Sequence, residues 1–290
     1  MADFSVFCLL DMKTTELDVI IIGAGLTGLA LAYFLKESSL SVMILESRDR
    51  VGGRIHTIKK EGLTTMEMGA TWLGKKHTVL ANLLEEFIIG IVEQEMGNTA
   101  IYEAISTSPP QIVKLDKQQD PTYRIDGSSS KLIEKLLSAI SPKVQLKLSE
   151  EVQSIQFLTD DSIVHTATTT YQSKTVVSTL PPNLLANTIV LKPTIDDQLM
   201  HQLKNTHTWM GESIKVGLHY KHPFWNEGNL SGTIMSNVGP IPEMYDHSNP
   251  ETGKYALKGF LNGSYYSVSK EERLKLILYC PQLNVDTKKA

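Results

Sequence analysis

Short apolar runs separated by helix-spaced apolar positions dominate the first part of the chain. Residues 19–22 read Val-Ile-Ile-Ile, a continuous apolar run that is typical of a strand buried on both faces of a parallel sheet. Residues 26–36 place their apolar positions on one face and predict a helix, and residues 41–45 predict a second buried strand. A strand, a helix and a strand in this order predict an α/β fold with a parallel sheet.

Three glycines lie in the turn between the first strand and the helix, in the spacing G-x-G-x-x-G. The first permits a tight turn, the second lets a pyrophosphate approach the backbone, and the third lets the helix pack closely on the sheet. The N–H groups that open the helix point at the anion. An acid follows about twenty residues later, where a ribose hydroxyl would be held. The predicted dinucleotide contacts are Gly23, Ala24, Gly25, Leu26, Thr27, Gly28 and Glu46.

The remaining pattern predicts further helices and strands. Helices are expected over 77–89, 131–140 and 270–279, and strands over 171–180, 214–220 and 255–261. Residues 144–148 and 152–157 are expected to form a small antiparallel unit, and residues 97–121 one or two short strands joined by exposed loops. The predicted inward-facing side chains of the first and last of these helices are Val79, Leu80, Leu83, Leu84, Phe87, Leu274, Ile277 and Leu278.

Composition excludes several classes of protein. With 41% hydrophobic and 21% charged residues the chain of 290 residues is ordinary globular material, and a net charge of −4 argues against a general nucleic-acid binder. Cys8 and Cys280 lie in no metal-ligand spacing, which predicts no metal site and a reducing compartment. Residues 1–16 are interpreted as a leader that is a poor signal peptide, and no run is long enough to span a membrane. A cytoplasmic protein is therefore expected.

The segment after the second strand indicates which dinucleotide cofactor the glycine turn would bind. It reads Glu46-Ser-Arg-Asp-Arg-Val-Gly-Gly-Arg54, which resembles the E-x-x-x-R-x-G-G-R extension of FAD-dependent amine oxidases. The resemblance implies that this turn supports the pyrophosphate and ribityl chain of FAD, with Arg50 left as a solvated basic residue. The contacts it implies are Ser47, Arg48, Gly52, Gly53 and Arg54.

Three later segments are similar to the same family. Met68, Gly69, Ala70 and Thr71 match a small-residue stretch beside the flavin ring. The backbone of Val152 is implied to meet the adenine. Residues 210–225 match the pattern M-G-x-x-x-K…Y-K-x-P-F-W of monoamine and polyamine oxidases, in which the lysine, here Lys215, reaches flavin N5 through a water.

These observations predict an α/β protein with a Rossmann-like FAD-binding domain and a second, mainly antiparallel β-sheet substrate domain. The FAD domain is assigned to residues 17–76 and 124–206, and the substrate domain to 77–123 and 207–290. The resemblance ends near residue 279, and the family's C-terminal flavin segment, which carries the covalent cysteine of some relatives, has no counterpart. We therefore expect a truncated family domain, a foreign tail over 281–290 and non-covalent FAD.

The resemblance implies oxidation of a primary or secondary amine to an imine, with O₂ reduced to H₂O₂. Three alternatives stay open: a truncated FAD-binding fragment without activity, a flavin enzyme of the phytoene desaturase or protoporphyrinogen oxidase kind, and an NAD-dependent Rossmann enzyme. The G-G-R extension disfavours the last, and the segment around Lys215 disfavours the desaturase. The expected partners are a small-molecule amine and O₂, and the residues leave the amine and the oligomeric state open.

Overall fold

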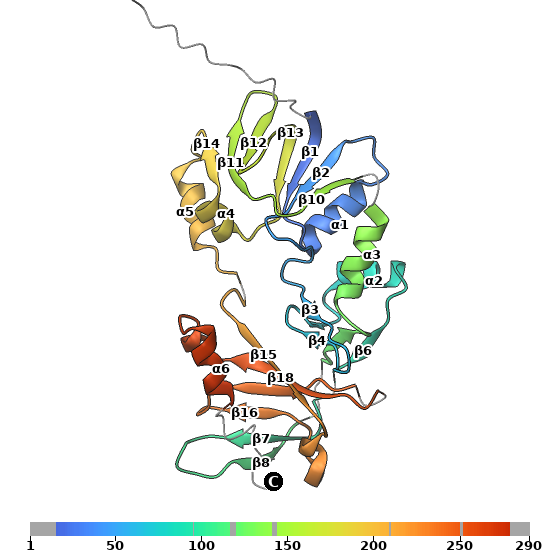
Figure 1. Cartoon of the computed structure of the whole chain (residues 1–290), viewed down its shortest axis with the longest axis vertical. Coiled ribbons are helices and arrows are strands. Elements are labelled where there is room, and N and C mark those ends of the chain that lie inside the picture. The colour runs from blue at the N-terminus through green and yellow to red at the C-terminus, as the bar shows by residue number, and fades with distance from the viewer. Residues whose placement is uncertain are drawn as a thin grey trace, which may run out of the picture. The chain divides into compact units, whose positions relative to one another are not determined.

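A computed structural model of the chain describes residues 16–94, 96–116, 120–140, 144–208, 210–249 and 252–278. The chain divides into two compact units, each made of two segments (Figure 1). The first unit contains Met1–Arg54 and Ile133–Trp209, and the second contains Ile55–Leu132 and Met210–Ala290. The predicted tail and both cysteines lie outside the described residues, as does the predicted leader apart from Glu16, which begins the first strand.

A seven-stranded sheet forms the centre of the first unit, in the order β10-β2-β1-β13-β12-β11-β14. Its strands are β1 (Glu16–Ile22), β2 (Val42–Leu45), β10 (Val144–Lys147), β11 (Val152–Phe157), β12 (Ser162–Thr166), β13 (Thr170–Ser178) and β14 (Val190–Lys192). Its helices are α1 (Leu26–Leu35), α4 (Pro182–Thr188) and α5 (Asp197–Asn205), with α3 (Ser130–Ile140) running into it. Strands β10, β2, β1 and β13 are all parallel, which confirms the predicted Rossmann-like sheet.

The core of this sheet explains why β1 is an interior strand, with a neighbour on each edge. Val19 to Ile22 pair with Val42 to Leu45 on one side and with Thr175 to Ser178 on the other. Ile20 and Ile21 are completely buried, as expected for an apolar run covered on both faces. Tyr171 and Val164 join the same core from the antiparallel part of the sheet.

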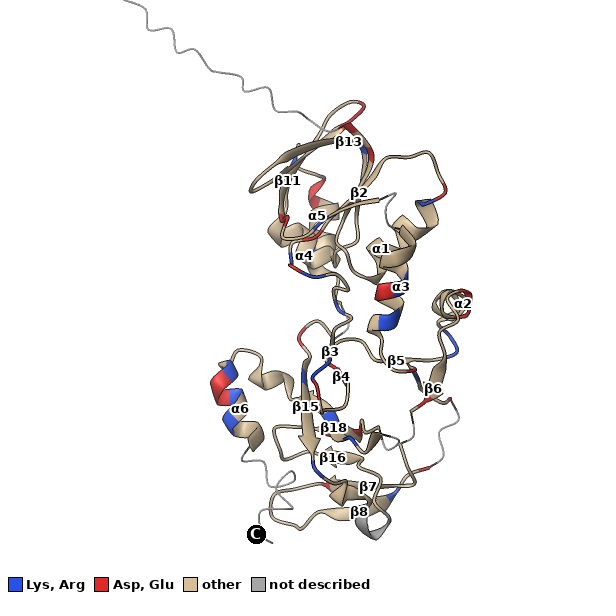
Figure 2. Cartoon of the chain, turned by 45° about the vertical axis from the view of Figure 1, so that its right-hand side comes forward, with Lys and Arg blue, Asp and Glu red and all other residues tan. Residues whose placement is uncertain are grey.

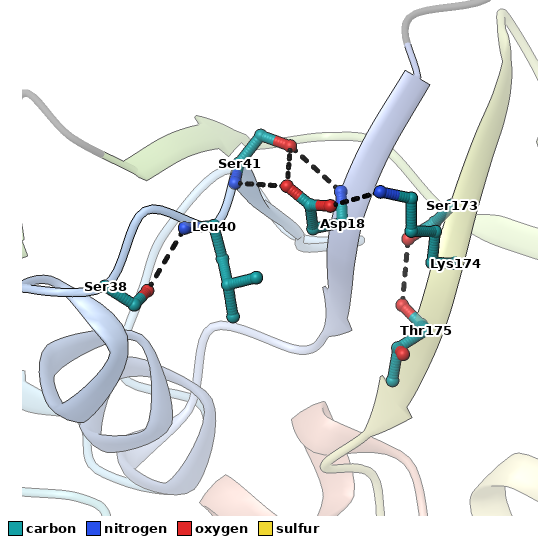
Figure 3. A network of polar contacts seen from close by, with 7 residues as sticks. All are labelled: Asp18, Ser38, Leu40, Ser41, Ser173, Lys174 and Thr175. Carbon is teal, nitrogen blue, oxygen red and sulfur yellow. Dashed lines mark hydrogen bonds and ion pairs between the residues drawn. The ribbon is translucent and has the colours of Figure 1, made fainter.

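Polar contacts link β1 to both of its neighbouring strands (Figure 3). The Asp18 carboxylate accepts from the backbone N–H and the hydroxyl of Ser41, at 2.9 and 2.8 Å, and pairs with Lys174 Nζ at 2.8 Å. The Ser41 hydroxyl oxygen in turn accepts the Asp18 backbone N–H at 2.9 Å. Lys174 first, and Ser41 second, hold the pKa of Asp18 well below its usual range. The network joins β1 and β13 to the residue that precedes β2.

The predicted antiparallel pairing of residues 144–148 with 152–157 is wrong. Strand β10 pairs in parallel with β2, Val144 opposite Val42, while β11 pairs antiparallel with β12. The physical reason lies in the turn between β10 and β11. There the Glu150 backbone N–H donates to the Glu46 carbonyl at 2.8 Å, which directs the chain along the end of β2 instead of folding it back on β10.

The second unit is built on a six-stranded sheet in the order β15-β18-β17-β16-β7-β8, antiparallel except for the β16–β7 pair. These strands are β7 (Thr99–Glu103), β8 (Gln111–Lys114), β15 (Ile214–Tyr220), β16 (Ile234–Ser236), β17 (Glu243–Asp246) and β18 (Tyr255–Leu261). Smaller sheets pair β3 (Thr57–Ile58) with β4 (Met66–Glu67), and β5 (Trp72–Leu73) and β6 (Ile91–Glu93) with β9 (Tyr123–Ile125). The helices are α2 (Thr78–Glu86), α6 (Lys270–Leu278) and the 3₁₀ segments η1 (Phe224–Asn229) and η3 (Gly263–Tyr265). The predicted mainly antiparallel second sheet is confirmed.

Two helices of this unit bury fewer side chains than their patterns predict. On α2 Leu83 and Leu84 are buried, but Val79 is 70% exposed. On α6, which mixes positive and negative positions in Figure 2, Ile277 packs on the core while Leu274 and Leu278 are 54% and 58% exposed. Both helices are only nine residues long, so a single turn of each meets the core.

The boundary between the units also falls elsewhere than predicted. Residues 55–76 and 124–132 belong to the second unit rather than to the first. The reason is strand pairing, because Trp72 and Leu73 of β5 bond to Arg124 and Tyr123 of β9. Whether the two units divide into cofactor and substrate domains stays a prediction.

Candidate functional site: a glycine turn and a buried lysine pair

The turn from β1 into α1 is closed by backbone packing at its first and last glycines. Gly23 has a φ of +102°, a conformation that side chains rarely adopt, and a Cβ there would lie 2.8 Å from Thr179 Oγ1. A Cβ on Gly28 would lie 2.0 Å from the carbonyl oxygen of Gly23. The Thr179 hydroxyl holds the turn to β13 by donating to the Ile22 carbonyl at 2.9 Å. The protein's own packing therefore requires both glycines.

Gly25 is different, because neither its backbone conformation nor its packing against the described residues requires a glycine. Its φ and ψ of −74° and −178° are open to any residue. Among the described residues, the nearest atom that an added Cβ would meet beyond its chain neighbours is Gly53 Cα, at 3.9 Å. Gly25 precedes the first residue of α1, no side chain caps that helix, and its first turn carries no acid. The free N–H groups and the open side at Gly25 fit a phosphate group.

Glu46 lies at the end of β2 and is only 7% exposed. Its Oε2 accepts from the Ala24 backbone N–H at 2.8 Å, and its Oε1 accepts from the Arg48 backbone N–H at 3.0 Å. A carboxylate accepts about four hydrogen bonds, so within the described part of the chain this group retains capacity for about two more. A ribose diol presents two such donors. Glu46 thus fits the role that the sequence predicts for it.

The turn that contains Gly52, Gly53 and Arg54 is hydrogen-bonded to the glycine turn between β1 and α1. The Gly52 N–H donates to the Ala24 carbonyl at 2.8 Å, and both Gly52 and Gly53 have positive φ. Arg48 and Arg50 both donate to the Gly53 carbonyl, at 3.2 and 3.1 Å. Arg50 is therefore half-buried and supports the turn, so its prediction as a solvated residue is wrong.

The structure brings the first group of predicted residues together. Glu46 N donates to the Lys147 carbonyl at 2.9 Å and Ser149 N to the Arg48 carbonyl at 2.8 Å, so the chain reaches Val152, at the start of β11, directly from this turn. Val152 is buried, whereas Ser47 and Arg54 are exposed beside the turn. The predicted contacts that belong to this unit are Gly23, Ala24, Gly25, Leu26, Thr27, Gly28, Glu46, Ser47, Arg48, Gly52, Gly53, Arg54 and Val152.

The second group of predicted residues meets within the other unit. The Met68 and Gly69 backbone N–H groups both donate to the His56 carbonyl, at 2.8 and 2.9 Å, which fixes the stretch that runs on through Ala70. Lys215, from β15, donates to the Gly69 carbonyl and to the Thr71 hydroxyl, the latter at 2.7 Å. Burial lowers the pKa of Lys215 to about 8, and the nearby Glu67 acts in the opposite direction.

Sequence reasoning missed a second lysine at this place. Lys258, on β18, is 1% exposed and its Nζ lies within hydrogen-bonding distance of the same Thr71 hydroxyl, at 3.2 Å. This nitrogen also lies 4.8 Å from the centre of the Trp72 ring. Burial first, and then Lys215, lower the pKa of Lys258 to about 6. The available signal was a lysine inside the apolar strand Tyr255–Leu261, because a charged residue in a buried strand needs a partner.

Glu67, Arg124 and His247 complete this buried polar cluster. Glu67 is 4% exposed and accepts from the Ser129 backbone N–H at 2.8 Å and the Thr57 hydroxyl at 3.0 Å. Arg124 NH1 lies 3.2 Å from His247 Nδ1, and because an arginine only donates, Nδ1 is the acceptor. Burial first, with Lys258 and Arg124 next, lowers the pKa of His247 far below its usual range, so the ring is neutral.

Two kinds of feature are absent from the residues that the structure describes. No group of three or more His, Cys, Asp or Glu side chains is arranged to hold a metal ion. None of the described helices has the length and apolar character needed to cross a membrane.

The chain is similar to known proteins over most of its length. Residues 26–105 and 98–280 match the family model described as flavin containing amine oxidoreductase. A probable flavin-containing monoamine oxidase A of Dictyostelium discoideum is 25% identical, over 92% of this chain and 80% of that protein. Human amine oxidase [flavin-containing] B is 23% identical, over 90% of this chain and 69% of that protein.

Solved structures show the same fold. Putrescine oxidase bound to putrescine matches with a TM-score of 0.77 at 21% identity, over 91% of this chain and 80% of that one. Cyclohexylamine oxidase from Brevibacterium oxydans matches with a TM-score of 0.74 at 18% identity over the same shares. Since the family model spans most of the sequence, the chain belongs to the flavin containing amine oxidoreductase family.

Proposed function

We propose that the chain binds FAD non-covalently and oxidises a primary or secondary amine, with O₂ as the electron acceptor. The observation that carries the proposal is Gly25, a glycine that neither backbone conformation nor packing requires. A bound pyrophosphate explains it, because only a residue without a side chain lets the phosphate oxygens reach the free N–H groups of α1. The relatives named as a probable monoamine oxidase and an amine oxidase support the amine as substrate class.

In the first unit each residue would serve a separate part of the dinucleotide. The residues from Gly23 to Gly28 would hold the pyrophosphate through backbone N–H groups, and Glu46 would accept from the ribose hydroxyls with the capacity that its two backbone donors leave. Gly52, Gly53 and Arg54 would extend this cradle along the ribityl chain. Arg48 and Arg50 fix the Gly53 carbonyl and so hold the shape of the turn.

In the second unit Gly69, Ala70 and Thr71 would lie beside the flavin ring, and Lys215 would hold a water near N5. Hydrogen bonds to the Gly69 carbonyl and the Thr71 hydroxyl already fix the position of the Lys215 ammonium. When bound, the flavin supplies the acceptor for the hydride leaving the carbon next to nitrogen, and it passes the two electrons to O₂ as H₂O₂. No protein base is required if the amine arrives neutral, and the imine product hydrolyses to an aldehyde.

The test is an absorption titration of the full chain with FAD, followed by anaerobic addition of a simple amine such as benzylamine or putrescine. We expect flavin bands that bleach with the amine and return with O₂, with H₂O₂ formed in equal amount. Bands that appear and never bleach would mean an FAD-binding protein without amine oxidation. A chain that never binds FAD would overturn the proposal.

A pair of glycine variants separates cofactor binding from folding. Gly25→Ala is expected to lower FAD affinity at least tenfold while costing less than about 1 kcal/mol of stability, the scale of a helix N-cap change. Gly74→Ala is the matched control, since a Cβ there meets nothing within 4 Å and is expected to change neither quantity. Equal FAD affinity in Gly25→Ala and the wild type would contradict the assigned phosphate site.

A further inference from the structure

The two lysines of the second unit share one hydroxyl and one face of a sheet. Lys215 pairs with Phe260 and Gly217 with Lys258, so the lysines are diagonal neighbours on β15 and β18, on which Figure 2 shows positive positions. Lys215 Nζ lies 2.7 Å from Thr71 Oγ1, and Lys258 Nζ lies 3.2 Å from the same oxygen. The two nitrogens are therefore at most about 6 Å apart.

Both lysine nitrogens lie close to the same aromatic ring. The Trp72 ring centre lies 5.4 Å from Lys215 Nζ and 4.8 Å from Lys258 Nζ. Neither lysine has a carboxylate within ion-pairing distance in the described part of the chain. The charged and titratable groups around Lys258 come from β15, β4, β9, β17 and the segment after β17, and they are Lys215, His219, Glu67, Arg124, Glu243, Tyr245, Asp246 and His247.

The other groups around the two lysines are neutral or already face an opposite charge or a hydrogen-bond donor. His247 is neutral, and Tyr245 is neutral because burial and Glu243 raise its pKa above the usual range. Arg124 keeps its charge and faces the carboxylates of Glu67 and Asp246. Two protonated lysines at most about 6 Å apart, neither ion-paired to a carboxylate in the described part of the chain, would repel each other in a buried region, which is costly.

We propose that Lys258 is a positioning residue for Lys215, and that the two amines, joined through the Thr71 hydroxyl, hold a single proton between them at neutral pH. A hydroxyl can accept from one group and donate to another. Thr71 therefore accepts from the Lys215 ammonium and donates to the neutral Lys258 amine, which fixes both. No bond other than to hydrogen is made or broken, and the proton moves only between the two nitrogens through the hydroxyl.

Removing either lysine is expected to change the titration of the pair in a different way. Coupled groups titrate in two steps that belong to the pair, and the lower step is depressed by the charge that the upper step retains. Removing Lys215 with Lys215→Met is therefore expected to raise the pKa of Lys258. Coulomb's law at about 6 Å with an effective dielectric constant of about 20 gives a shift of about 2 pH units. Lys258→Met is expected to remove the lower step and leave the Lys215 pKa almost unchanged.

The measurement is NMR of the full chain labelled with ¹³C-lysine, without flavin, following the Cε shifts with pH. The two single variants assign the signals and both introduce an unbranched apolar side chain of similar length. Lys221→Met, an exposed lysine just after β15, is the matched control and is expected to move neither pKa. Thr71→Val is expected to raise the pKa of Lys258 and lower that of Lys215, because it removes the hydrogen bond that favours each observed form. An unchanged Lys258 pKa in Lys215→Met would overturn the proposal.

Only the expected effect of Lys258 on turnover rests on the proposed function. If Lys215 acts in amine oxidation, Lys258→Met is expected to shift the acid limb of the kcat–pH profile while Lys221→Met does not. A chain that binds no FAD would defeat the proposed function and leave the NMR test intact. Uncoupled lysines in an active oxidase would defeat the inference alone.

Discussion

The glycine turn of the first unit and the lysine cluster of the second are built from different kinds of chemical group. The turn is made of backbone groups, and Gly23, Gly28 and Gly53 allow its close packing because they have no side chain. The cluster is made of long charged side chains, Lys215 and Lys258, buried against one hydroxyl. A backbone site is rigid and its fit is steric, while a site of buried charges depends on which groups are protonated. The two sites should therefore respond to different perturbations, the first to added volume and the second to pH.

The largest difference is expected in the pH dependence of stability. The pKa of Lys258 is lowered from 10.5 to about 6 in the folded chain, so between these values the unfolded chain binds more protons. Stability must then rise with pH across this window, by about 1.4 kcal/mol per pH unit for one such group. Urea unfolding of the second unit from about pH 6.5 to 9 measures the slope. Lys258→Met is expected to remove most of it and Lys221→Met to keep it, whereas equal slopes in all three proteins would contradict the buried charge.

A substitution in the glycine turn is the matching test for the first unit. Gly28→Ala places a Cβ 2.0 Å from the Gly23 carbonyl oxygen, and the backbone has to shift because that oxygen belongs to the strand end. We expect a loss of about 3 kcal/mol, at the upper end of overpacking costs, with no dependence on pH. Thermal unfolding of Gly28→Ala beside Gly25→Ala gives the comparison. A Gly28→Ala protein as stable as Gly25→Ala would show that the turn is not sterically closed.

Glu46 is a buried charged residue at the glycine turn. Its substitution is expected to lower stability less than Gly28→Ala does. In Glu46→Gln one of the two backbone N–H groups of Ala24 and Arg48 faces an amide NH₂ and loses its acceptor. The expected cost is about 1.5 kcal/mol, together with roughly tenfold weaker FAD binding. Isothermal titration with FAD and urea unfolding measure the two effects. Glu151→Gln, at an exposed position, is the control, and weakened FAD binding in both variants would point to net charge instead.

The smallest effect is expected at the exposed network around Asp18. Its folded pKa lies below the ordinary value of 3.8, so its contribution is present above that value and is lost as the pH falls toward the folded pKa. Asp18→Asn should lower the unfolding midpoint slightly at neutral pH and low salt, and less at high salt, because exposed pairs are screened. Asp160→Asn, exposed in the turn between β11 and β12, is the control. A midpoint that is lowered equally at both salt concentrations would rule out the ion pair with Lys174 as the cause.

Sequence reasoning found the backbone site almost completely and the charged site only in part. The glycine turn is contiguous, and each glycine and Glu46 carries a local signal that follows from the strand–turn–helix context. Lys215 was found through its flanking residues. Lys258, Glu67 and Arg124 were missed because what makes them significant is burial beside one another, and they come from strands far apart in the chain. The pairing of β10 with β2 was missed for a similar reason, since the turn contact between Glu150 and Glu46 that sets it is not local.

The interior place of β1 in its sheet has a consequence for synthesis. Its neighbour β13 ends at Ser178, so β1 emerges from the ribosome long before the strand that covers its second edge exists. At typical translation rates of about 5–20 residues per second this interval lasts roughly 8–30 s. During that time the run from Val19 to Ile22 has one open edge and no antiparallel hairpin partner. The nascent chain is therefore expected to need a holding chaperone before residue 178 has been made.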